Sequence, residues 1–219
     1  MVTKVVESAA AAVDGIEDGA TIMIGGFGVA GLPAALVDAV IDQGARDLTI
    51  VSNNAGTGDT GLAALLKTKR VRKIICSYPR QTDSYVFDAL YRAGEIELEV
   101  VPQGNLVERI RAAGAGIGAF YTPTAAGTML GDGKESRIFD GREFILEHPI
   151  HADVALIKAF KGDRWGNLVY RKTARNFGPV MATAARCAVA QVEEVVELGT
   201  LDPESIVTPG IFVARVVAA

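Results

Sequence analysis

The stretch Thr21-Ile22-Met23-Ile24-Gly25-Gly26-Phe27-Gly28-Val29-Ala30-Gly31-Leu32-Pro33 joins a short apolar run to clustered glycines. Such a pattern predicts a buried strand that turns sharply, and Leu32-Pro33 predicts the start of a helix. Glycines let backbone N–H groups approach an anion closely, and the helix N-terminus adds positive charge on the same side. We therefore predict that the phosphate-bearing part of a ligand binds at Gly25, Gly26, Phe27, Gly28, Val29, Ala30 and Gly31.

Short apolar strands alternate with helical segments along the rest of the chain. The alternation is typical of an α/β fold with an open, largely parallel sheet, helices on both faces and ligands at the carboxyl ends of the strands. A glycine-rich and then charged stretch at 114–147 predicts a small β-hairpin insertion, which either covers a site or crosses the surface. No linker divides the sequence, so 1–219 is predicted to be a single domain. Strands are expected at 21–24, 48–52, 74–77, 95–101, 154–160, 167–170, 188–196 and 211–217, and helices at 5–13, 34–43, 62–68, 84–93, 106–113 and 178–184.

The charge balance argues against a nucleic-acid partner. The 219 residues carry 22 Lys and Arg against 26 Asp and Glu, a formal charge of −4, whereas a nucleic-acid-binding protein is expected to present a basic face. The one basic cluster, at 67–73, is interpreted as a solvated helix end. The uncharged runs 19–37 and 112–131 contain too much Gly, Pro and Thr to cross a membrane, and the first residues lack a signal-peptide pattern. Cytoplasmic residence is the expectation.

Metal and disulfide chemistry have little support in the sequence. Cys76 and Cys187 form no pattern and are expected to be buried free thiols. His148 and His151 lack partners at metal-ligand spacing. The sequence therefore predicts neither a metal site nor a bound cofactor.

A dinucleotide site is the first alternative for the glycine segment, because 26–31 satisfies G-x-G-x-x-G after a strand. Such sites place an acidic residue at the end of the second strand to hold a ribose hydroxyl. Here that strand ends in Ser52-Asn53-Asn54, and Asp47 precedes it. The nicotinamide or flavin hypothesis stays open on this motif but is the weaker one.

A family resemblance gives the glycine segment a second interpretation. Asp18-Gly19, the apolar strand, Gly25-Gly26-Phe27, Gly31 and Pro33 together resemble the signature of family I coenzyme A transferases, in their A subunit. Within that family, 77–81 and 161–167 are most similar to members that act on 3-oxoadipate. The similarity covers nearly the whole chain, because further family-like segments follow in order at 52–56, 102–106, 108–110, 120–124 and 174–177.

This resemblance implies an activity that one chain cannot complete. Family members move CoA from succinyl-CoA to a 3-oxo acid through a glutamyl anhydride and a glutamyl-CoA thioester. The nucleophilic glutamate of two-subunit members lies in a Glu-Asn-Gly-type segment of the B subunit, and this sequence has no counterpart. The resemblance therefore implies a CoA-transferase B subunit as the partner, CoA thioester as substrate and, as acceptor, 3-oxoadipate from aromatic catabolism. Acetoacetate is the alternative acceptor, and a non-catalytic scaffold role is a further hypothesis.

Polar side chains that follow predicted strands are the candidate site residues. The resemblance places Gln103 near the reacting carbonyl, where an amide can donate to the oxygen that gains charge; the alternative is that it caps a helix. Asn53 and Asn54 either line the acyl pocket or close a tight turn. At 125–128 this sequence has Ala-Ala-Gly-Thr where the family usually has Gly-Tyr-Gly-Thr, which can alter the pocket. Cations for a distal carboxylate are available at Arg80, Arg164, Arg171 and Arg175.

Overall fold

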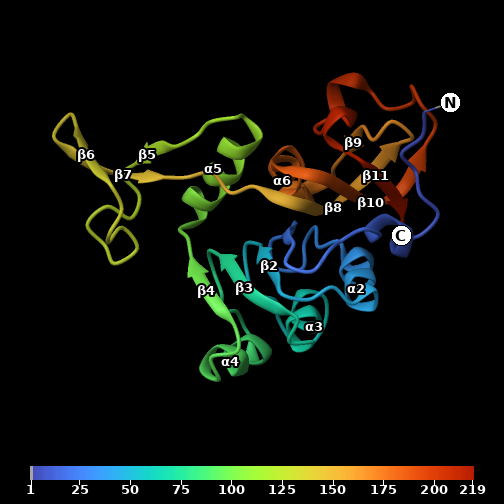
Figure 1. Cartoon of the computed structure of the whole chain (residues 1–219). Helices are drawn as coiled ribbons and strands as arrows, with labels where there is room; N and C mark the ends of the chain where they lie inside the picture. Colours follow the sequence, from blue (N-terminus) through green and yellow to red (C-terminus); the bar gives the residue numbers. More distant parts are fainter. Residues whose placement is uncertain (1) are drawn as a thin grey trace.

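A parallel sheet forms the centre of the molecule in the computed structural model, which describes residues 2–219 (Figure 1). Its strands lie in the order β11-β10-β8-β1-β2-β3-β4, all paired in parallel, and β9 pairs antiparallel with β8. The largely parallel α/β sheet predicted from the sequence is therefore confirmed. The strands are β1 (Thr21–Ile24), β2 (Leu48–Val51), β3 (Val71–Cys76), β4 (Glu97–Val100), β8 (Ala152–Asp163), β9 (Leu168–Val169), β10 (Ala185–Val196) and β11 (Arg215–Ala218).

Helices cover both faces of this sheet, as the sequence predicts. Successive residues of a strand point to opposite faces, so Ile22 and Ile24 of β1 pack with one core and Met23 packs with the other. The first core lies under α1 (Ala9–Val13), α2 (Ala34–Gln43), α3 (Leu62–Lys67) and α4 (Tyr85–Arg92). The second lies under α5 (Gln103–Gly114) and α6 (Gly178–Ala184). Short 3₁₀ turns occupy η1 (Lys172–Arg175), η2 (Pro203–Ser205) and η3 (Gly210–Phe212).

A second, antiparallel sheet projects from the body beside α5 (Figure 1). It consists of β5 (Phe120–Thr122), β6 (Ser136–Phe139) and β7 (Arg142–Glu147) in the order β5-β7-β6. The predicted hairpin is present as β6 and β7, and β5 adds a third strand to it. We call residues 114–147 the extension.

Several boundaries differ from the sequence-based prediction, among them those near residues 5–8, 211–214 and 103–105. Residues 5–8 are not helical, because Val5 bridges to Val216 in β11 and the hydroxyl of Ser8 caps α1 by accepting from the amide of Ala11 at 3.1 Å. Residues 211–214 are not a strand: Ile211 lies in η3 and β11 begins only at Arg215. Helix α5 begins at Gln103, three residues before its predicted start at 106.

The basic cluster at 67–73 is only partly a helix end. Lys67 ends α3, but Arg72 and Lys73 lie in β3, where they pair with acidic side chains of neighbouring segments. Arg72 contacts Asp47 at 3.1 Å and Glu97 at 3.3 Å. The cluster is therefore not a single helix end, because a sheet brings together charges that are far apart in the sequence.

Within residues 2–219 no helix is long and apolar enough to span a bilayer, and no group of three or more His, Cys, Asp or Glu side chains is placed to hold a metal.

A chain of ion pairs runs from the sheet edge through α5 to the extension. Lys73 of β3 pairs with Glu99 of β4 at 2.6 Å, and Glu99 pairs with Arg109 of α5 at 2.9 Å. Arg109 lies 3.7 Å from Glu147 of β7, which also binds Lys134 at 2.6 Å. These pairs fix α5 between the sheet and the extension.

Glu99 makes part of this stability depend on pH. Burial by itself raises the pKa of its carboxyl, but hydrogen bonds and charge from Lys73 and Arg109 outweigh burial and hold the pKa below its ordinary value. A carboxyl whose pKa is lower in the folded state contributes stability at higher pH and loses that contribution as the pH falls through the folded pKa.

We therefore expect Glu99→Gln to flatten the acid dependence of stability below about pH 4.3, the ordinary pKa of a Glu side chain. Urea unfolding midpoints of both proteins between neutral and acid pH test this expectation. Parallel pH curves for the two proteins would contradict it.

Candidate functional site

A cavity of about 450 Å³ opens at the carboxyl edge of the parallel sheet. Its walls come from the segments that leave β1, β2 and β3 and from the first residue of α5, which follows β4. This is the edge where a parallel α/β sheet is expected to bind its ligand. Four sequence-predicted residues meet here, among the lining residues Phe27, Gly28, Asn53, Ser77, Tyr78, Gln81 and Gln103.

The carboxamides of Asn53 and Gln103 form the polar centre of the cavity. Gln103 Nε2 donates to Asn53 Oδ1 at 2.7 Å, and the Ser77 hydroxyl donates to the same oxygen at 2.8 Å. Two donors on Oδ1 fix the orientation of the Asn53 amide. Among the described residues no acceptor takes the Nδ2 group of Asn53 or the second N–H of Gln103, so both are free to donate to a ligand.

Gln103 does not cap its helix, which was the alternative role for it. It is the first residue of α5, Pro102 precedes it, and no side chain caps this helix end. The Gln103 amide turns instead to Asn53, which is only 3% exposed and anchored by its backbone carbonyl. That carbonyl accepts from the amides of Ser77 at 3.2 Å and Tyr78 at 3.0 Å.

Asn54 has the other role considered for it, the closing of a turn. Its side chain is 4% exposed, and its Oδ1 accepts from the amide of Gly56 at 2.9 Å. Gly56 has φ +84°, and a Cβ there would lie 2.5 Å from the amide nitrogen of Ala63, so the turn requires glycine. Asn54 lines a separate hollow of about 30 Å³ between this turn and the glycine-rich segment at 25–31, too small for a substrate.

Fewer backbone amides are free in the glycine-rich segment than the sequence suggests. We call residues 25–31 the glycine loop. The amide of Gly25 donates to Leu156 at 2.9 Å and that of Gly26 to Asn176 Oδ1 at 3.1 Å, while Phe27 and Ala30 bond to each other. Within the described residues this leaves the amides of Gly28, Val29 and Gly31 for a ligand. At the start of α2 the amide of Ala35 donates to Gln191 Oε1 at 3.2 Å, so that helix end is also partly occupied.

Three cavity residues, Ser77, Tyr78 and Gln81, were not among the predicted site residues. The sequence drew attention to 77–81 only as a mark of substrate preference. A stronger signal was available: Ser77 follows β3 as Asn53 follows β2, and in a parallel sheet those positions are neighbours.

The thiol next to this site is not a nucleophile. Cys76 ends β3, is buried and is free of a disulfide, as is the half-buried Cys187. Burial raises the pKa of Cys76 to about 12, so the thiol stays protonated at neutral pH.

The four candidate arginines and the extension lie outside the cavity lining. Arg80 is next in sequence to Gln81, but its guanidinium pairs with Asp88 at 2.7 Å. Arg171 lies over the ring of Phe160. The altered segment 125–128 belongs to the extension, so its expected effect on the pocket does not come from direct lining. Ala125, at the position of a family glycine, has φ +74°.

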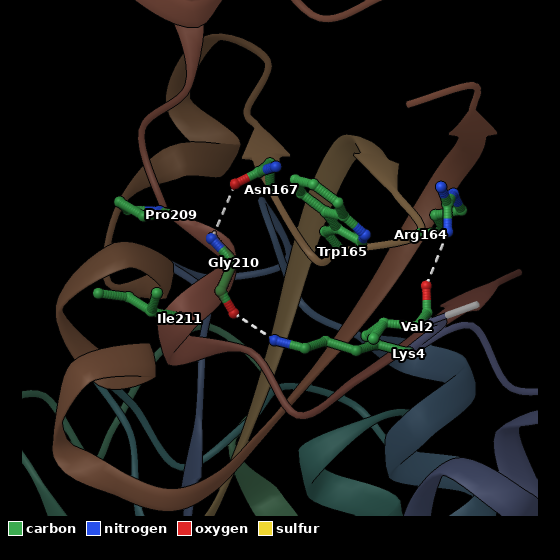
Figure 2. A pocket seen from close by; sticks show the side chains of 8 residues that line it. All are labelled: Val2, Lys4, Arg164, Trp165, Asn167, Pro209, Gly210 and Ile211. Atoms are coloured by element: carbon green, nitrogen blue, oxygen red, sulfur yellow. Dashed lines mark hydrogen bonds between the residues drawn. The ribbon is translucent and has the colours of Figure 1, made fainter. Parts of the chain in front are cut away.

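A larger hollow of about 550 Å³ lies near the N-terminus (Figure 2). Its polar groups are used to hold the chain together: Lys4 Nζ donates to the carbonyl of Gly210 at 2.6 Å, and Arg164 donates to the carbonyl of Val2 at 2.9 Å. Because its Lys4, Arg164 and Asn167 side chains already bond to other parts of the chain, the smaller cavity at Asn53 and Gln103 is the better candidate site. The hollow is lined by Val2, Lys4, Arg164, Trp165, Asn167, Pro209, Gly210 and Ile211.

Comparisons with known proteins match nearly the whole chain to one family. Residues 6–219 match the family model described as Coenzyme A transferase. The chain is 70% identical to the A subunit of 3-oxoadipate CoA-transferase from Pseudomonas putida, covering 100% of this chain and 94% of that protein. It is 66% identical to the protein of the same name from Acinetobacter baylyi, covering 99% and 95%. Among solved structures, the acyl-CoA transferase YdiF of Escherichia coli O157:H7, in a thioester complex with CoA, superposes with a TM-score of 0.86 at 26% identity. That match covers 100% of this chain and 47% of YdiF, so the chain spans about half of YdiF.

Proposed function

Because the chain belongs to the coenzyme A transferase family, we propose that it is the A subunit of a two-subunit enzyme that moves CoA from succinyl-CoA to 3-oxoadipate. Relatives that carry this name are 70% and 66% identical over nearly their whole length, which supports both the acceptor and the need for a B subunit. Acetoacetate is the second candidate acceptor, because the described residues that line the cavity include no cation for a distal carboxylate.

One observation supports the division of labour: the cavity offers donors but no nucleophile. Within residues 2–219 its lining supplies three carboxamides, two hydroxyls and no carboxylate. A glutamate from the B subunit completes such a site, because a carboxylate that attacks a thioester needs donors where the carbonyl oxygen gains charge.

The residues of this chain then have definite roles in the transfer. The partner's glutamate attacks the thioester carbon of succinyl-CoA, and the C–S bond breaks. CoA leaves as thiolate, and glutamate and succinate remain joined as a mixed anhydride. The thiolate attacks the glutamyl carbonyl, which releases succinate and forms a glutamyl-CoA thioester. The carboxylate of the 3-oxo acid then attacks the glutamyl-CoA thioester, which releases CoA thiolate and forms a second mixed anhydride. The thiolate attacks the 3-oxoacyl carbonyl of that anhydride, which forms the product thioester and frees the glutamate. Gln103, oriented by Asn53, donates its free N–H to the carbonyl oxygen as that oxygen gains charge.

The glycine loop has the second role in this proposal, that of binding the CoA thioester. Phe27 and Gly28 lie in the same cavity as Gln103, so a ligand at the loop reaches the reacting carbonyl. The free amides of Gly28, Val29 and Gly31 are the donors offered to it. The acyl group of the substrate lies against Asn53, on the side of the cavity away from the glycine loop.

We expect the purified chain alone to catalyse no CoA transfer, because the nucleophile is missing from it. Co-production with a B-type chain that carries a Glu-Asn-Gly segment is expected to give CoA transfer from succinyl-CoA to 3-oxoadipate, with a higher kcat/KM than for acetoacetate. An assembled pair that transfers CoA to neither acid would rule out the proposal. A higher kcat/KM for acetoacetate would favour the second acceptor instead.

A further inference from the structure

The side chain of Asn176 joins two segments that are far apart in the sequence. The amide of Gly26 donates to Asn176 Oδ1 at 3.1 Å, and Asn176 Nδ2 donates to the carbonyl of Ala30 at 2.9 Å. In its own turn, Nδ2 also donates to Thr173 at 2.8 Å, and the amide of Phe177 donates to Oδ1 at 2.7 Å. The carboxamide thus uses two acceptor and two donor positions, which is its full capacity.

The glycine loop also packs directly on the turn that carries Asn176. Gly31 has φ +76°, and a Cβ there would lie 2.5 Å from the carbonyl oxygen of Ala174 and 2.9 Å from Asn176 Nδ2. Glycines leave the loop backbone with wide freedom, so its shape has to be imposed by neighbours. The contact with residues 174–176 supplies that constraint.

The two hydrogen bonds from Asn176 lie on either side of Phe27 and Gly28, which line the candidate cavity. Asn176 itself does not line it. We propose that Asn176 is a positioning residue that holds the glycine loop in the shape that turns Phe27 and Gly28 toward the reacting groups. For catalysis this inference rests on the proposed function, whereas the constraint on the loop does not.

Asn176→Asp tests the inference with little change in shape. The aspartate keeps an acceptor for Gly26 but loses both donors, and sets a carboxylate oxygen against the carbonyls of Ala30 and Thr173. Asn167→Asp is the matched control, because Asn167 also links distant segments, beside the hollow of Figure 2. Its Oδ1 accepts from Gly210 at 2.9 Å and its Nδ2 donates to Asp163 at 2.8 Å.

In the assembled two-subunit enzyme we expect N176D to lower kcat by about ten- to a hundredfold, as displaced catalytic groups do. N167D is expected to leave kcat unchanged. Its loss of thermal stability is expected to equal or exceed that of N176D, because the new carboxylate faces Asp163. In the isolated chain, amide hydrogen exchange of the bonded loop amides Gly26, Phe27 and Ala30 is expected to accelerate in N176D alone. Asn176→Ser, with a single short hydroxyl, replaces N176D if that variant does not assemble.

The outcomes separate this inference from the proposed function. Equal kcat values for N176D and N167D would overturn it, as would unchanged exchange of the loop amides. A wild-type complex without CoA-transferase activity would count against the proposed function, and the exchange data would still decide whether Asn176 holds the loop.

Discussion

Replacing Gln103 by Ala is expected to lower kcat for CoA transfer by about a hundred- to a thousandfold, the usual effect of removing one donor from an oxyanion site. The reason lies in the cavity: Gln103 Nε2 binds Asn53 through one N–H and has its second N–H free for the carbonyl oxygen. The measurement is steady-state transfer by the assembled two-subunit enzyme, with assembly checked by size-exclusion chromatography.

Two further variants make the Gln103 test specific. Gln103→Glu keeps the size of the side chain but replaces the donor with a carboxylate, so its kcat is expected to fall at least as far. Glu108→Ala lies on the same helix, where Glu108 pairs with Arg111 near the surface, and is expected to keep near-normal activity. An assembled Q103A enzyme with normal turnover would instead support the scaffold hypothesis, in which this chain only supports its partner.

Removing Glu147 is expected to cost about 2 kcal/mol of unfolding free energy, because it takes a buried carboxylate away from the partly buried cations of Lys134 and Arg109. The Glu147 side chain is only 3% exposed, and it binds Lys134 at 2.6 Å and Asn105 at 3.1 Å. Since Asn105 and Arg109 both belong to α5, the extension is also expected to detach from this helix. Urea unfolding of Glu147→Ala and of the wild type measures the loss.

Glu143→Ala is the matched control for Glu147→Ala. Glu143 lies on the same strand, β7, but is exposed, so its removal is expected to change the unfolding free energy by less than about 0.5 kcal/mol. Similar losses for the two variants would show that burial of Glu147 against α5 is not what holds the extension. Faster hydrogen exchange in residues 120–147 of Glu147→Ala alone would locate the effect in the extension.

Elements with strong local signals could be predicted from the sequence at their observed bounds. β1 and α2 lie where they were predicted, because an apolar run, Pro33 and the final glycine define them locally. Gly44, after α2, has φ +95°, a left-handed conformation that glycine adopts readily at a helix end. The bounds of α6 were also predicted correctly.

The first and last residues of elements that depend on distant partners could not be predicted from the sequence. β8 is longer than predicted at both ends, and β10 begins before its predicted start. The added residues are not simply apolar. Part of the reason is pairing across the strands: Lys161 faces Glu194, and their side chains pair at 2.8 Å. Likewise Val5 does not join α1, because its partner is Val216 at the other end of the chain.

The sequence by itself determined the fold class and the family, because these depend on local patterns and on motifs in order. Only the tertiary structure decided which polar residues work together. Asn53 and Asn54 are adjacent, yet one enters the cavity and the other closes a turn. Gln103 and Ser77 reach Asn53 across 50 and 24 residues, because a parallel sheet gathers the carboxyl ends of its strands at one edge.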